Sequence, residues 1–160
     1  MTPRKELFVA IQNELKSIAS LELVDLQRKQ FSNPKETYGT IYTAALIGIR
    51  KIAWGQMVGQ RQEGDCNVEV IIYTKDGWVD QHDTTSDPEN GLEEIDLIDE
   101  VVEKLLFLNS ENFKPLMLIE EAPEDEDNEM LSYKVTFNTT IYRTINKRYL
   151  TKKITSNTQP

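Results

Sequence analysis

The sequence has one cysteine, one histidine and no long apolar run. Cys66 alone excludes an internal disulfide and a zinc site built from cysteines, and it fits a reducing compartment. A membrane-spanning helix needs about 20 apolar residues, and the amphipathic N-terminal segment differs from a signal peptide. The net charge of −9 disfavours binding to duplex DNA. The composition therefore predicts a cytoplasmic protein that contacts neither nucleic acid nor a membrane.

The length of 160 residues and the apolar content of 39% predict a single folded domain with a packed core. A chain of this length buries roughly 70% of its unfolded surface. We place the domain at residues 1–145. Residues 146–160 are basic and then polar, and we expect them to form a flexible C-terminal tail.

The chain is organised around the stretch Gly39–Val79, which is rich in Val, Ile, Tyr and Trp. It predicts two extended arms, Ala44–Val58 and Val68–Tyr73, joined by a polar turn at Gly59–Asp65. This long hairpin is expected to be the centre of a β-sheet.

The first arm changes phase along its length. Ile47 and Ile49 share one parity, whereas Ile52 and Trp54 have the other. Because one extra residue in a strand reverses the facing of every side chain beyond it, the pattern predicts a β-bulge near Gly48–Lys51.

Two amphipathic helices are predicted. The first runs from about Pro3 to Ala19, with Thr2 as its cap. Arg4 and Lys5 lie at the end of this helix that its macrodipole makes unfavourable for cations. The second begins near Asn90. The predicted apolar stripes are Leu7, Ile11, Leu15 and Ile18 in the first helix, and Leu92, Ile95, Ile98, Val102, Leu105 and Leu106 in the second.

Three further strands are predicted at Leu21–Gln27, Leu116–Glu121 and Leu131–Arg143, with an acidic loop at Pro123–Glu129 before the last one. Strands in consecutive pairs with helices between them predict the α+β class. We expect an antiparallel sheet built around the long central hairpin, with two helices packed on one face.

The residues that most often carry chemistry form no convincing site. His82 with Asp80 and Asp83 contains metal-ligand types, but adjacent loop residues rarely converge on one ion, so a solvated loop is favoured. Cys66 has no basic neighbour closer in sequence than Arg61, which favours an unreactive thiol. The Glu120–Glu129 cluster lacks the ligand spacing of a calcium-binding loop. The sequence therefore predicts no catalytic residue, no metal site, no cofactor and no enzymatic activity.

Two features point to contacts between proteins. Trp54 lies near Arg50 on an extended arm, and large aromatic residues beside arginine are typical of protein interfaces, although core filling is the more common role of tryptophan. Acidic residues dominate Glu93–Glu129, and from Met130 onward every charged residue is basic. This separation is either ordinary surface charge or the sign of head-to-tail assembly, in which one subunit's basic end meets the next subunit's acidic loop.

The segments Tyr42–Ile47 and Val68–Ile72, with Trp54 between them and a hairpin turn through Gly64, resemble the tail terminator and tail-completion proteins of long-tailed bacteriophages. The resemblance covers roughly residues 5–145 and consists of patterns rather than a fingerprint. Thr43 stands where relatives often carry proline, and the basic segment after Ile145 has no counterpart in the pattern.

The resemblance implies a virion component that forms a ring, often of six subunits, on the finished tail tube and offers a docking face to the head connector. The partners would be copies of the chain itself, the tail tube protein and the connector protein. A neck or head–tail connector protein is the alternative within this class, and a monomeric adaptor that binds through the Trp54 face is the alternative outside it. The candidate interface residues are Arg50, Trp54, Glu124, Asp125, Glu126, Arg143, Lys147 and Arg148.

Within such a ring, Arg143, Lys147 and Arg148 of one subunit are predicted to meet carboxylates of the Glu124–Glu129 loop of the next. Reversing the charges of Arg148 and Asp125 together should then restore assembly that either single reversal abolishes.

Overall fold

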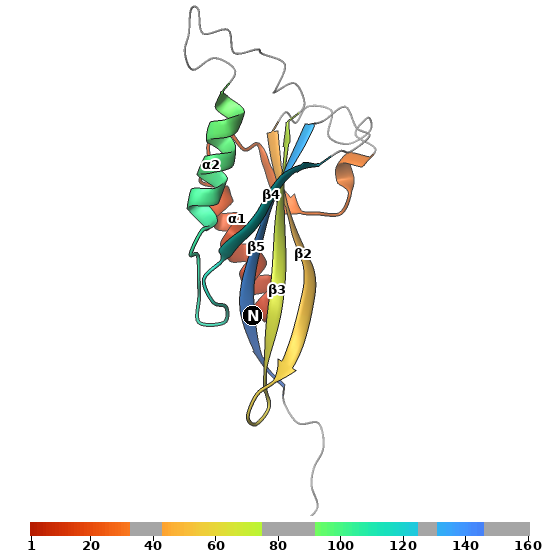
Figure 1. Cartoon of the computed structure of the whole chain (residues 1–160), viewed down its shortest axis with the longest axis vertical. Coiled ribbons are helices and arrows are strands. Elements are labelled where there is room, and N and C mark those ends of the chain that lie inside the picture. The colour runs from red at the N-terminus through yellow and green to blue at the C-terminus, as the bar shows by residue number, and fades with distance from the viewer. Residues whose placement is uncertain (33–42, 75–91, 125–130, 146–160) are drawn as a thin grey trace, which may run out of the picture.

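The computed structural model describes residues 1–32, 43–74, 92–124 and 131–145, and Figure 1 shows their arrangement. These residues form two α-helices, one short 3-10 helix and five strands. In chain order they are α1 (Pro3–Leu15), β1 (Leu23–Leu26), η1 (Gln30–Ser32), β2 (Thr43–Gln56), β3 (Arg61–Thr74), α2 (Glu93–Leu105), β4 (Met117–Glu124) and β5 (Leu131–Thr144).

The five strands form one sheet in the order β1-β2-β3-β5-β4. The β2–β3 hairpin lies at its centre, and β3 pairs with β5 along the full length of both strands. The predicted α+β class and the central hairpin are confirmed. The sheet is mostly antiparallel, but β1 runs parallel to β2, which the sequence pattern did not predict. A parallel neighbour is possible here because η1 and residues 33–42 lie between the two strands in the sequence and give the chain room to return.

The turn of the central hairpin is shorter than predicted. Residues Gly59–Asp65 were expected to form the turn, yet β3 already begins at Arg61. The Met57 amide donates to the Arg61 carbonyl at 3.0 Å, and Gly59 has a φ of +80°, so the turn is confined to residues 57–60. Glu63 and Asp65 continue the strand because they lie on an open face of the sheet, where polar side chains contact solvent.

The predicted bulge is present. The pairing register between β2 and β3 shifts between Ile49 and Ile52. As a result Ile47 and Ile49 before the shift, and Ile52 and Trp54 after it, all pack against the same core. One inserted residue thus keeps the apolar side chains of a long strand on one face.

Both helices cover the same face of the sheet, as predicted (Figure 1). Helix α1 ends at Leu15, four residues earlier than expected, although Ile18 is still buried in the turn that follows. Thr2 occupies the N-cap position, where its carbonyl accepts the Glu6 amide hydrogen bond at 3.0 Å, but its side chain makes no capping bond.

The predicted apolar stripe of α2 is partly wrong. Leu97 and Val101 are buried, whereas Ile95 is 54% exposed. The helix carries more apolar residues than one face can bury, so packing against α1 and the sheet decides its rotation.

A second, smaller cluster covers the opposite face at the end of the sheet near η1. Phe31 packs on Tyr73 with ring centroids 4.8 Å apart, together with Leu46 and Ile71. The Gln27 side chain donates a hydrogen bond to the Tyr73 hydroxyl at 2.9 Å. Nearer the hairpin turn, the exposed side chains of β3 include the polar residues Glu63 and Asp65.

The last two strands agree with the prediction except at their ends. Strand β5 matches the predicted Leu131–Arg143 to within one residue. Strand β4 begins one residue late and extends to Glu124, so Pro123 and Glu124 belong to the strand and not to the acidic loop. The rest of that loop lies outside the described residues.

Candidate interaction surface

Trp54 and Arg143, two of the predicted interface residues, lie together at the hairpin end of the sheet. Trp54 on β2 is opposite Gly64 on β3, and the missing side chain of Gly64 leaves room for the indole ring. The Arg143 guanidinium carbon, from β5, lies 3.7 Å from the centroid of the Trp54 ring. Its Nε donates to the Gln62 side chain at 2.8 Å. The ring and the amide thus hold the arginine in a cation–π arrangement.

Two hollows flank the start of α1, and we call them the cationic hollows. The smaller one, about 300 Å³, is lined by Trp54 and Arg143 with residues 2–4 and Thr144. The larger one, about 470 Å³, is lined by Arg4, Lys5 and Arg50, together with Thr2, Phe8, Leu26, Gln27, Gly48 and Ile49. Thr2 and Arg4 line both. None of the described residues that line them is a carboxylate, and the two hollows together present four cations, of which Arg50 is paired with Glu69 outside the lining.

Arg50 forms an ion pair with Glu69 of β3, at a Nε–Oε2 distance of 2.5 Å. It lies inside the bulged segment between Ile49 and Ile52. The bulge therefore determines where this arginine projects. Its side chain is still 47% exposed, so it is accessible to a partner.

The opposite edge of the sheet is acidic. Residues 92–124, which contain α2 and β4, carry ten carboxylates and two lysines. Residues 1–32 and 43–56, which contain α1, β1 and β2, carry seven basic and four acidic side chains. The acidic segment thus includes the edge strand β4, whereas three of the four cations of the hollows lie on α1 and β2.

Glu124, another predicted interface residue, has a partner within the chain. Its carboxylate lies 2.7 Å from the Lys134 ammonium of the neighbouring strand β5. The hydrogen bond to Glu124 raises the pKa of Lys134. Ser132 also donates its hydroxyl to the Glu124 carbonyl at 3.1 Å, which holds the end of β4 against β5.

Arg143 and Glu124 cannot meet within one chain. Glu124 pairs with Ser132 near the start of β5, whereas Arg143 lies eleven positions further along that strand. At about 3.3 Å per residue the separation is roughly 35 Å. A contact between the two residues therefore requires a second copy, and the predicted pairing between subunits stays a prediction.

Of the remaining predicted interface residues, Arg50 lines the larger hollow, while Asp125, Glu126, Lys147 and Arg148 lie outside the described residues. The sequence-based reasoning missed Arg4 and Lys5 as members of the surface. Their unfavourable position at the start of α1 was the available signal, because cations there oppose the helix macrodipole and gain nothing from the helix itself.

The described residues contain no other arrangement suited to chemistry. Cys66 is fully buried, and burial raises the pKa of its thiol to about 11, so it is not a nucleophile at neutral pH. No group of three or more His, Cys, Asp or Glu side chains in the described part of the chain is arranged to hold a metal ion. His82 lies outside that part. None of the described helices is long and apolar enough to cross a membrane.

No protein-family model matches the sequence, and no curated protein matches it either.

Proposed function

We propose that this chain is a non-enzymatic assembly protein of a long-tailed phage or prophage, which forms a closed head-to-tail ring and acts as a tail terminator. In this proposal the ring caps the tail tube and provides the surface that joins the head connector. The protein would then be found in the virion, and in the host cytoplasm during assembly.

The observation that supports this proposal best is the position of the two charged surfaces. The cationic hollows lie beside β2 and α1, and the acidic residues lie on β4 and α2. A closed ring with heterologous contacts needs two different and complementary patches on each subunit, placed so that one copy's first patch meets the next copy's second. The cationic hollows of one subunit and the acidic β4 and α2 of the next could meet this requirement without a change in the fold of either subunit.

Light scattering of the purified chain at low ionic strength tests the proposal. We expect a single closed oligomer whose mass falls toward that of the monomer at high salt, because exposed charge pairs are screened within a Debye length of about 3 Å at 1 M salt. A monomer at every concentration and salt would favour an adaptor and contradict the ring.

A matched pair of variants on α1 separates assembly from folding. Arg4→Glu removes a cation from both hollows but places an acid at the helix N-terminus, where it stabilises the helix by about 0.3–1 kcal/mol. Lys16→Glu makes the same charge change at the C-cap, where it destabilises the helix by a similar amount. We expect Arg4→Glu to lose the oligomer and Lys16→Glu to keep it. The reverse result, or equal oligomers in both variants, would exclude the hollows as the contact.

A further inference from the structure

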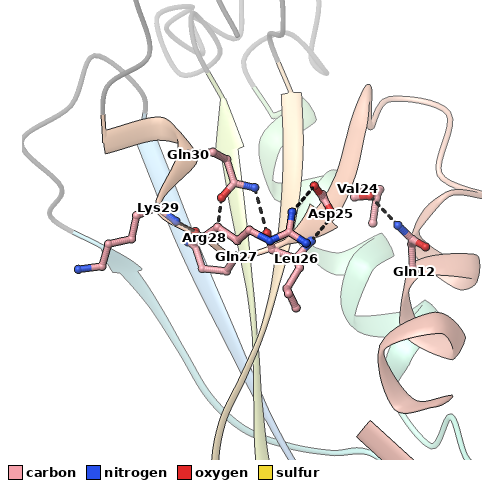
Figure 2. A network of polar contacts seen from close by, with 8 residues as sticks. All are labelled: Gln12, Val24, Asp25, Leu26, Gln27, Arg28, Lys29 and Gln30. Atoms are coloured by element: carbon pink, nitrogen blue, oxygen red, sulfur yellow. Dashed lines mark hydrogen bonds and ion pairs between the residues drawn. The ribbon is translucent and has the colours of Figure 1, made fainter. Parts of the chain in front are cut away.

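The two edges of the sheet differ in their free backbone groups. On the β1 edge, side chains occupy the backbone groups that point outward, as Figure 2 shows. Gln12 of α1 donates to the Val24 carbonyl at 3.0 Å. The Leu26 amide donates to the Asp25 carboxylate at 2.7 Å, and the Leu26 carbonyl accepts from Gln30 at 3.0 Å. These bonds leave little for an incoming strand to pair with, so the β1 edge is closed.

The β4 edge carries no such bonds among the described residues. Strand β4 is the last in the sheet, and β5 is its one strand neighbour in the described chain. Alternate backbone groups of an edge strand point away from its neighbour and are free to bind another chain. Met117 and Ile119 are about half exposed, and Glu120 and Glu121 are exposed. Pro123 has no amide hydrogen, so the open edge extends over residues 117–122.

The chemistry of this edge selects its partner. A second β4 strand would bring Glu120 and Glu121 opposite like charges, which is destabilising. A strand that carries cations and apolar residues would instead match both the acidic and the exposed apolar side chains of β4.

We propose that residues 146–160 of a second copy add to the β4 edge as an extra strand. This segment contains four basic side chains and no acidic one, together with the strand-favouring residues Tyr149, Leu150 and Ile154. Its fifteen residues exceed the eight of β4. Addition of an extended peptide to a free sheet edge is a common mode of recognition, with backbone hydrogen bonds giving affinity and side chains giving specificity.

The starting point of the segment supports a second copy as its source. It follows Ile145, whose amide donates to the Gln60 carbonyl beside the hairpin turn, and Thr144 lines the smaller cationic hollow. A copy whose hollows face the acidic edge of its neighbour therefore brings its own C-terminal segment to β4. The inference deepens the proposed head-to-tail assembly and rests on it.

Disulfide cross-linking between two full-length populations tests the inference. One population carries Ile119→Cys on β4, and the other carries Tyr149→Cys, Leu150→Cys or Thr151→Cys, one at a time so that the unknown register is covered. Cys66 is fully buried and unreactive, so the unmodified chain supplies the background. Arg28→Cys, exposed beside the closed β1 edge, replaces Ile119→Cys in the matched control.

After oxidation, we expect a covalent dimer in at least one Ile119→Cys mixture, about tenfold above the Arg28→Cys control. Adding Glu120→Lys and Glu121→Lys to the β4 population should lower the yield about tenfold, since charge pairs steer association. Lys152→Glu and Lys153→Glu in the other population should restore it. No dimer above the control, or no effect of charge reversal on the yield, would overturn the inference.

Hydrogen exchange distinguishes strand addition from simple charge contact. Slow exchange across residues 117–122 and within 146–160 at high protein concentration is expected, because backbone amides in a sheet are protected. Fast exchange in both segments of a cross-linked sample would exclude a paired strand. A ring without the cross-link would overturn this inference alone, whereas a cross-linked dimer without a ring would overturn only the proposed function.

Discussion

Substitution of Gly64 by alanine should disrupt the cation–π contact between Trp54 and Arg143, because the new Cβ atom would push against the indole ring. A Cβ atom at position 64 would lie 2.7 Å from the Ile52 Cγ2 atom and 2.9 Å from the Trp54 Cε3 atom. Carbon atoms pack at about 3.5–4.0 Å, so the indole ring has to move outward. The ring supports the Arg143 guanidinium at 3.7 Å, and the cation–π contact is lost when it moves.

Two opposing effects determine the size of the change. Overpacking a well-packed site costs about 1–3 kcal/mol. Replacing glycine by alanine in the unfolded chain recovers about 0.4–1 kcal/mol of conformational entropy. The clash is larger, so the free energy of unfolding should fall by about 1–2 kcal/mol. For a chain of this size the expected loss in Tm is about 2–8 °C.

Gly55→Ala is the matched control. Gly55 lies on β2, one residue after Trp54. A Cβ atom at Gly55 would meet no other atom closer than 3.8 Å. Neither glycine has a positive φ, so alanine fits the backbone at both positions. Gly55→Ala should therefore raise the free energy of unfolding by about 0.4–1 kcal/mol, whereas Gly64→Ala lowers it. Urea denaturation measures both, and a Gly64→Ala chain as stable as Gly55→Ala would refute the reasoning.

Three further predictions follow from buried or paired ionisable groups. Hydrogen bonds from Ser110 and Asn112 lower the pKa of Glu6. The stability that ionised Glu6 contributes is therefore complete above about pH 4.5 and is lost as the pH falls through the pKa of Glu6 in the folded protein. Glu6→Gln should flatten the acid limb of a profile of Tm against pH. The hydrogen bond to Glu124 raises the pKa of Lys134, so this pair stabilises the fold fully below about pH 10.5 and no longer does so above the pKa of Lys134 in the folded protein. Lys134→Met should lower the free energy of unfolding by about 0.2–1 kcal/mol at pH 7. It should also remove the decline in stability that deprotonation of Lys134 causes at alkaline pH. Cys66 should react with a thiol reagent only in denaturant, and rapid reaction of the native protein would contradict its burial.

Local patterns in the sequence were enough to predict the central hairpin and its bulge. The change of parity between Ile49 and Ile52 can be explained only by an extra residue if one face is to stay apolar. The alternation along β5 was equally informative, because a half-buried strand must place apolar side chains at every second position. These features depend on residues close in sequence, so no knowledge of distant neighbours was needed.

The turn length and the rotation of α2 could not be predicted in this way. Gly64 and Asp65 have low intrinsic strand propensity, and the sequence pattern placed them in a turn. In the folded chain Gly64 lies in β3 because it pairs with Trp54 of β2 and Ile141 of β5, and its missing side chain leaves space for the Trp54 ring. Ile95 and Leu97 of α2 are both apolar, and packing against α1 and the sheet selects Leu97 for the core.

For the candidate interaction surface, too, the sequence indicates one part and only the tertiary structure shows the other. The sequence alone indicated that acidic and basic residues occupy different parts of the chain, because charge can be counted without a structure. Only the tertiary structure brought Arg4, Lys5, Arg50 and Arg143 together from three separate elements, and only the strand order placed the acidic β4 at the far edge. The physical reason is that long-range contacts form wherever the sum of apolar burial and strand pairing is most favourable, and that sum depends on residues far apart in the sequence.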